Sequence, residues 1–184
     1  MPMREELKLY LRMLIPMLIL FLGLPLLSYL IWRFYPEKKL EVLLIDKTVP
    51  NRDYREHAGV IWALNHEKFK KNTGADYLVD QDYLGFFPDG TRDKKGVVKD
   101  LEGKSEEEIK KLVSETDLVF LVDTYGVYES DFGQVQREKK IYGGLGKSEI
   151  ELIRQAKDQG KYLIAEFNSM ASPTSKSVRS EFEN

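Results

Sequence analysis

Acidic and polar side chains gather where three predicted strands end, and these side chains are the first candidates for chemistry. Asp46 follows an apolar strand over residues 40–45, Asp123 ends a second strand over residues 117–123, and Glu166 lies near the end of a third strand. Open sheets of parallel strands bind their ligands at the carboxyl ends of the strands. We therefore expect a ligand-binding rim formed by Asp46, Asp123, Tyr125, Glu166 and Asn168.

Two interpretations of this predicted rim stay open. Three carboxylates at neighbouring strand ends suit general acid–base chemistry or a hard cation such as magnesium. Acidic and hydroxylated side chains also cap the helix that follows a strand and solvate the edge of a sheet, and this is the more common role. We therefore assign no catalytic residue, no metal and no cofactor from the sequence.

Other motifs stop short of a complete catalytic set. The chain has no cysteine, which excludes disulfides, Cys-ligated zinc and thiol catalysis. Residues 143–148 (GGLGKS) are similar to a phosphate-binding loop, but Ile141 stands where the first glycine is required. His57 and His66 point to opposite sides of one predicted helix, so they cannot form an i, i+4 metal pair. We expect them to be solvated or satisfied in the core, although His57 could approach the rim.

Strands and helices alternate along the part of the chain that must position these residues. Capping patterns predict the helix starts at Asp53, Ser105 and Ser148, each followed three residues later by a glutamate. Apolar runs predict strands over residues 40–45, 77–87, 117–123 and 161–167. This alternation indicates parallel βαβ units with right-handed crossovers, and hence a layered α/β sheet.

An uncharged stretch precedes that domain. Residues 13–32 contain no ionisable side chain and lie between Arg12 and Arg33. Twenty helical residues span about 30 Å, the thickness of the hydrocarbon core of a bilayer. A core helix would have a polar face, and a signal peptide would have a shorter apolar region followed by small residues. We therefore predict a tail over residues 1–12, a single transmembrane helix over residues 13–33 and a linker over residues 34–39.

The membrane orientation follows only weakly from charge. Three basic residues stand on each side of the span, so the positive-inside rule gives a tie. Because the leader is short, we expect the amino terminus in the cytoplasm and the domain outside it. The whole chain has a net charge of −2 with both signs interspersed, and it lacks the basic stripe that nucleic-acid binding requires. The predicted partners are therefore the lipid bilayer and a protein in a membrane complex, and not nucleic acid.

The second half of the domain resembles a known family. The pattern begins with a strand that is followed by an Asp-Thr-Tyr-Gly loop at 123–126 and by Gly-Gly-Leu at 143–145. A helix, Gly-Lys at 160–161 and a further strand come next. This order is similar to that of the class I glutamine amidotransferase-like (flavodoxin-like) domain, including uncharacterised membrane-attached relatives. The resemblance implies a parallel-sheet three-layer sandwich. In the active family a catalytic cysteine follows the last of these strands and a histidine comes later, whereas here Phe167 lies nearest that position and no histidine follows. Glutaminase activity is therefore not expected.

Together these patterns predict a single-pass membrane protein with an α/β domain over residues 40–184. The final residues resemble the first turns of a helix, so we expect the domain to be incomplete at its carboxyl end. The predicted function is the binding of a small ligand or protein partner in an envelope or transport assembly. The alternative is a carboxylate-dependent, metal-assisted hydrolase acting on envelope sugars or peptides.

Overall fold

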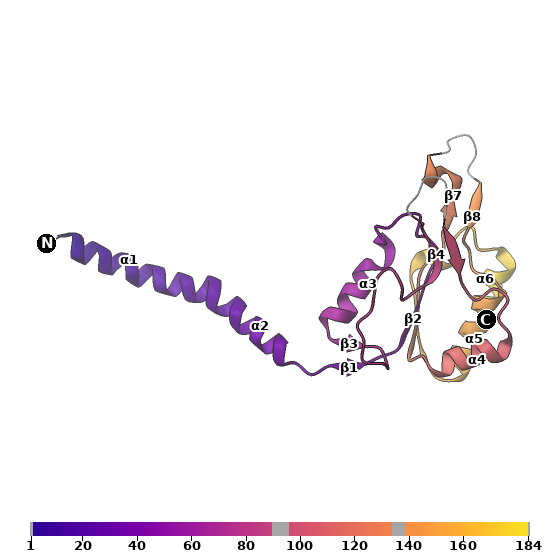
Figure 1. The fold of residues 1–184 in the computed structure, drawn as a ribbon, viewed down its shortest axis with the longest axis horizontal. Coiled ribbons are helices and arrows are strands. Elements are labelled where there is room, and N and C mark those ends of the chain that lie inside the picture. The colour runs from indigo at the N-terminus through magenta and orange to yellow at the C-terminus, as the bar shows by residue number, and fades with distance from the viewer. Residues whose placement is uncertain (1, 90–95, 134–138, 184) are drawn as a thin grey trace. The chain divides into compact units, whose positions relative to one another are not determined.

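The computed structural model describes residues 2–89, 96–133 and 139–183 (Figure 1). The chain divides into two compact units, Met1–Glu37 and Lys38–Asn184, and each is described by itself.

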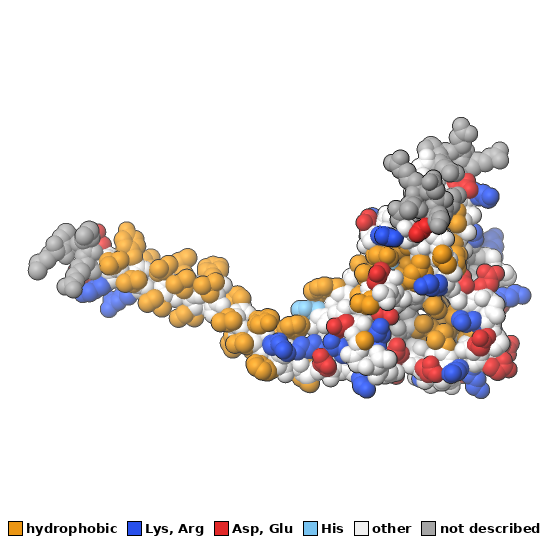
Figure 2. All heavy atoms as spheres, viewed as in Figure 1, with side chains coloured by type: hydrophobic (Ala, Val, Ile, Leu, Met, Phe, Trp, Pro, Cys, Tyr) orange, Lys and Arg blue, Asp and Glu red, His pale blue; other side chains and the backbone are white. Residues whose placement is uncertain are grey.

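The first unit is a helix without interruption. It consists of α1 (Pro2–Leu18), a π-helical turn η1 (Ile19–Gly23) and α2 (Leu24–Phe34), so the predicted tail is helical as well. The wide turn precedes Pro25, which has no N–H to donate, and the N–H of Leu24 bonds the carbonyl of Ile19, five residues back. Within Glu5–Phe34 a window of 18 residues has a mean hydropathy of 2.4, and none of that window is buried. Figure 2 shows the hydrophobic side chains along this helix. The helix is thus long and apolar enough to span a membrane, although a signal sequence would have the same properties.

The second unit is built on a five-stranded, mostly parallel sheet, which confirms the mixed α/β class. The strand order is β5-β4-β2-β6-β9, and only β5 runs antiparallel to its neighbour. The central strand β2 therefore pairs with two strands that come much later in the chain. The strand bounds are β2 Val42–Asp46, β4 Leu84–Phe87, β5 Val97–Lys99, β6 Leu118–Asp123 and β9 Tyr162–Ala165.

The second unit also contains two short two-stranded sheets and two 3₁₀ turns. The first ladder joins β1 (Lys38–Lys39) to β3 (Phe69–Lys70). The second joins β7 (Val127–Tyr128) to β8 (Lys140–Tyr142). The 3₁₀ turns are η2 (Glu129–Phe132) and η3 (Phe167–Met170).

Helices pack against both faces of the large sheet. The helix α3 (Arg55–His66) lies on one face, where Ile61 and Leu64 contact Leu44 and Val42. The helices α4 (Glu106–Ser114), α5 (Lys147–Asp158) and α6 (Lys176–Glu183) share the other core, which includes Ile45 and Leu121. Successive residues of a strand point to opposite faces, so Leu44 and Ile45 belong to different cores. Figure 1 shows α3 separated from α4 and α5 by the strands.

Of the three predicted helix starts, one is confirmed and two are wrong. The capping box of Ser105 and Glu108 is confirmed by bonds of 2.8 and 3.2 Å. The predicted start at Asp53 is wrong, because α3 begins at Arg55 after Tyr54, which adopts a left-handed conformation with φ 49°. The predicted start at Ser148 is also wrong, because Glu149 Oε2 accepts the N–H of Gly146 at 2.7 Å and so places the helix start earlier.

Candidate functional site

The first two predicted rim residues lie where the sheet changes its direction of winding. From β2 the chain crosses to β4 on one side, and it then returns to β6 on the other side of β2. Such a switch point opens a crevice at the carboxyl ends of the two strands. A β-bulge at Val122 brings Asp123 directly opposite Asp46, and the N–H of Lys47 donates to the carbonyl of Asp123 at 2.8 Å.

Asp46 forms a buried pair with His57. Both side chains are fully buried, and His57 Nδ1 lies 2.6 Å from Asp46 Oδ2. The other ring nitrogen, Nε2, lies 2.8 Å from the carbonyl oxygen of Val79, which can only accept, so Nε2 must carry a hydrogen. The second hydrogen bond then requires one proton, shared between Nδ1 and Oδ2. Asp46 is therefore enclosed by its contact with His57, and it is not an open ligand.

Asp123 is held by polar contacts and is only partly buried. Its Oδ1 accepts the N–H of Tyr125 at 2.7 Å, and its Oδ2 accepts from Asn168 Nδ2 at 3.2 Å. Tyr125 thus supports Asp123 through its backbone, while its exposed ring lies 5.0 Å from that of Tyr128, measured between centroids. The structure therefore brings Asn168 to the predicted rim as a partner of Asp123.

Two glutamates respond to the charge of these aspartates. Partial burial raises the pKa of Glu166 above its ordinary value, and Asp123 and Asp46 raise it further. Burial also raises the pKa of Glu56, and the same two aspartates add to the increase. Glu56, at the start of α3, is a member of the site that sequence reasoning missed. We call Glu56, Asp46, Asp123, Glu166 and Asn168 the carboxylate rim.

Lys47 does not neutralise this rim, because it points to the opposite face of the sheet. Its Nζ lies 2.8 Å from Glu149 Oε1, and both side chains are about 95 % buried. The ammonium group also lies 5.1 Å from the centroid of the Tyr142 ring. This pair joins β2 to α5, and no sequence pattern indicated it because its two members are about a hundred residues apart. Among the described residues, no group of three or more His, Cys, Asp or Glu side chains is arranged to hold a metal ion.

Gly85 allows β4 to approach the rim. It pairs with Asp46 in the sheet and has φ 154°. A Cβ atom at this position would lie 1.7 Å from the carbonyl oxygen of Asp46. In the sequence this glycine interrupts an apolar run. In the structure it lets β4 pair closely with β2, because it has no side chain.

An open groove lies beside the buried pair. Its volume is about 820 Å³, which falls within the range of small-ligand sites. Val79, whose carbonyl binds His57, lines it, and so does the left-handed Tyr54. The full lining is Arg52, Asp53, Tyr54, Ala58, Val79, Asp80, Phe87 and Pro88.

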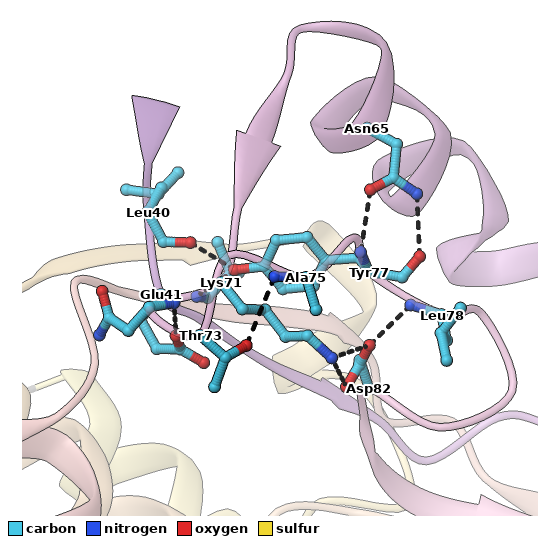
Figure 3. Close-up of polar contacts among 11 residues, drawn as sticks. Leu40, Glu41, Asn65, Lys71, Thr73, Ala75, Tyr77, Leu78 and Asp82 are labelled. Atoms are coloured by element: carbon cyan, nitrogen blue, oxygen red, sulfur yellow. Dashed lines mark hydrogen bonds and ion pairs between the residues drawn. The ribbon is translucent and has the colours of Figure 1, made fainter. Parts of the chain in front are cut away.

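A second polar cluster surrounds Tyr77 at the amino-terminal edge of the sheet, and its role is structural (Figure 3). The Tyr77 hydroxyl donates to the carbonyl of Leu40 and accepts the N–H of Val42 at 2.9 Å. The amide of Asn65 bonds both the N–H and the carbonyl of Tyr77, at 2.9 and 2.8 Å. Burial raises the pKa of Tyr77 to about 12, so the hydroxyl stays protonated and fastens this loop to the start of β2.

No family model matches the chain, and no curated protein or solved structure matches it either.

Proposed function

We propose that this protein is a membrane-tethered, non-catalytic binding module whose carboxylate rim takes a cationic group of a small ligand. A protein partner in an envelope or transport assembly could present the same group. The fold proposed is a flavodoxin-like, amidotransferase-like three-layer sandwich, with the domain on the extracytoplasmic side.

The strand order supports the fold proposal. When the four parallel strands of the large sheet are numbered along the chain, their spatial order is 2-1-3-4, which agrees with the order 2-1-3-4-5 of flavodoxin-like sheets. In that fold the ligand lies at the switch point between the first and third strands, which here are β2 and β6. Position 167 holds phenylalanine and the chain has no cysteine, which supports binding over thiol chemistry.

One observation carries the binding proposal: the rim has more negative charge than its own residues neutralise. Burial raises the pKa of Glu56 and of Glu166, and the negative charges of Asp46 and Asp123 raise both further, while Arg55 offsets part of the increase at Glu56. A bound ammonium or guanidinium group would relieve this repulsion. The groove of about 820 Å³ beside His57 is separate from this rim, because none of the rim residues lines it.

The same carboxylates favour one alternative, a hydrolase of envelope sugars or peptides. A glutamate whose pKa is raised partly by a nearby aspartate is an arrangement that suits a general acid and a general base. Glu166 would then protonate a leaving group while Asp123 activates water.

The binding proposal can be tested with a matched pair of probes. The full chain in detergent micelles is titrated by calorimetry with glucosamine and with its uncharged counterpart, N-acetylglucosamine, and spermidine serves as a second cation. We expect binding of the cations only, and a loss of at least about tenfold in affinity in the double variant Asp123→Asn/Glu166→Gln. The control Glu107→Gln, an exposed acid on α4, should leave binding unchanged.

Two outcomes would contradict the binding proposal. If the neutral sugar binds as tightly as glucosamine, charge does not drive recognition. If the double variant binds like the native protein, the ligand lies elsewhere. Cleavage of a chromogenic glycoside or peptide that is lost in Glu166→Gln would instead favour the hydrolase.

A further inference from the structure

The groove beside His57 lies at the carboxyl ends of two neighbouring parallel strands. Phe87, which lines it, is the last residue of β4, and the loop that follows β2 contributes Arg52 and Asp53. Open α/β sheets take their ligands at this end of their strands. The groove has a volume of about 820 Å³, and no residue of the carboxylate rim lines it. It is therefore a candidate for a second, separate site.

The walls of this groove are fixed by the core beneath them. The ring of Tyr54 lies 5.7 Å from that of His57 and 6.3 Å from that of Tyr83, measured between centroids, and the latter two residues are buried. The carbonyl of Val79 accepts a hydrogen bond from the same histidine at 2.8 Å. Two lining residues from different segments thus contact one buried side chain, so a ligand would meet a groove that is already formed.

Tyr54 has an unfavourable backbone conformation at the groove. Its φ of 49° and ψ of 35° are left-handed, which is rare for a residue with a bulky side chain. Such exceptions cluster where proteins bind ligands. Because Tyr54 joins Asp53 to the first residue of α3, this turn sets the direction from which the charged residues before it reach the groove.

Three charged side chains line the groove, and two of them are adjacent in the sequence. The α-carbon atoms of Arg52 and Asp53 are about 3.8 Å apart, as in any pair of consecutive residues, so a positive and a negative group enter the groove side by side. Asp80 adds a second carboxylate. Within residues 2–89, 96–133 and 139–183, neither carboxylate forms a hydrogen bond or an ion pair. Both are therefore open to a ligand.

Arg52 is positioned and still has donors to offer. Its Nη2 donates to the carbonyl of Asp89 at 2.8 Å. A guanidinium group has five N–H donors in a planar fork, so this bond orients the group and leaves other donors for a carboxylate.

The remaining lining is mainly apolar, and Phe87 gives it an aromatic edge. The ring of Phe87 stacks on that of Tyr83 at 4.2 Å between centroids, and Lys99 Nζ lies 4.2 Å from the centroid of the Phe87 ring. Two groups this close to one ring centre occupy its two faces, so the ring edge remains for a ligand. The edge of one aromatic ring packs well against the face of another.

We propose that the groove binds a free aromatic α-amino acid. The α-carboxylate accepts hydrogen bonds from the guanidinium group of Arg52. The α-ammonium group has three N–H donors, so it can bond Asp53 and Asp80 together. Both charges of an amino acid are attached to one carbon atom, which matches the adjacency of Arg52 and Asp53. The aromatic side chain lies in the apolar part of the groove, against the edge of Phe87.

Three probes that share one body test this assignment. The full chain in detergent micelles is titrated by calorimetry with phenylalanine, with phenylalanine amide, which has no carboxylate, and with N-acetylphenylalanine, which has no ammonium group. We expect phenylalanine to bind at least about tenfold more tightly than the other two, because each of them lacks one charged contact. No binding of phenylalanine, or equal binding of either analogue, would overturn the proposal.

Substitutions locate the site. Arg52→Gln and Asp80→Asn each replace an exposed side chain, and each should weaken the binding of phenylalanine at least about tenfold. The matched controls are Arg154→Gln on α5 and Glu107→Gln on α4, which remove exposed charges of the same kind far along the chain from the groove. Native affinity in both groove variants would place the ligand elsewhere and contradict the assignment.

The outcome is separable from that of the proposed function. The double variant Asp123→Asn/Glu166→Gln should bind phenylalanine like the native protein, and Arg52→Gln should bind glucosamine like the native protein. The three probes are compared in the double variant as well, because phenylalanine amide is itself a cation that the rim would take. If the double variant loses phenylalanine together with glucosamine, the rim is the site of both and the groove is not.

Discussion

Asp46 is the residue on which the site is centred, and it is not a free carboxylate. Its proton-sharing contact with His57 is fully buried, so either partner alone would leave an uncompensated polar group in the core. The exposed members of the rim, above all Glu166, are therefore the ones that can meet a ligand.

Removal of His57 should destabilise the domain strongly. We expect His57→Phe to cost about 3–5 kcal/mol in the free energy of unfolding, because it leaves Asp46 buried without its partner. The double variant Asp46→Leu/His57→Phe should recover part of this loss, and urea unfolding of all three proteins would measure it. Equal stability of His57→Phe and the native protein would show that the pair is not formed.

Glu166 should make stability depend on pH in a predictable direction. Its pKa in the folded state is raised above the ordinary value of 4.5, so the folded protein binds a proton more tightly than the unfolded chain. The resulting stabilisation is present below pH 4.5 and is lost as the pH rises through the raised pKa. Glu166→Gln should therefore increase the melting temperature at pH 7 and have little effect at pH 4. A decrease at pH 7 would contradict this assignment.

Gly85 should not tolerate a side chain. A Cβ atom would lie 1.7 Å from the carbonyl oxygen of Asp46, so Gly85→Ala must separate β4 from β2. We expect a loss of more than about 4 kcal/mol, which is exceptional for a single substitution. Gly59→Ala on α3 is the control, because its Cβ would meet nothing within 4 Å and alanine favours a helix by about 0.5–1 kcal/mol. Similar melting temperatures for the two variants would rule out the close approach.

At the scale of elements, the Tyr77 cluster fixes the loop before β4 to the beginning of β2. Tyr77→Phe removes a hydroxyl that bonds both Leu40 and Val42, so we expect a loss of about 1–3 kcal/mol in chemical unfolding. Tyr125→Phe, whose ring is exposed, should change stability by less than about 0.5 kcal/mol. An equal effect of both changes would show that the cluster contributes nothing.

The helices and strands were predicted from local sequence patterns, and the wrong predictions of their bounds have local causes. The apolar runs located β2, β6 and β9 to within about two residues. The strand predicted over residues 77–87 was too long, because only Leu84–Phe87 (β4) is a strand. The helix α3 begins two residues after the predicted start at Asp53 and ends at His66. The helix starts after Tyr54, which has a left-handed backbone conformation. The residue type at position 54 does not predict this conformation.

The site was predicted less completely than the fold. Strand ends were sufficient to group Asp46, Asp123, Glu166 and Asn168, whereas Tyr125 contributes through its backbone N–H. The bulge at Val122 and the membership of Glu56 depend on how β6 and α3 meet β2. Contacts between distant segments leave no periodic pattern in the sequence, and the pairing of Lys47 with Glu149 is another example.

At the scale of the whole molecule, the apolar helix and the domain present different surfaces. The exposed surface of the helix is hydrophobic on all sides, while acidic and basic side chains are interspersed over the visible face of the domain (Figure 2). This division of surfaces suits one unit in lipid and the other in water.

A charge in the middle of the helix should weaken its membrane insertion. We expect Leu20→Arg to cost about 2.5–3.5 kcal/mol of insertion free energy and to increase the fraction released by carbonate extraction. Leu7→Arg, near the charged end of the helix, should be retained like the native chain. A mature protein whose mass lacks the helix would identify a cleaved signal sequence and contradict the tether.

The position of β2 also constrains how the domain is made. This strand is the first of the large sheet to be synthesised, yet its neighbours β4 and β6 end only at Phe87 and Asp123. During translation β2 can therefore pair with β4 only after about forty further residues have been added, and with β6 only after about eighty. The sheet is thus completed from its middle outwards, and ribosome-bound chains halted before and after β6 should differ in protease resistance.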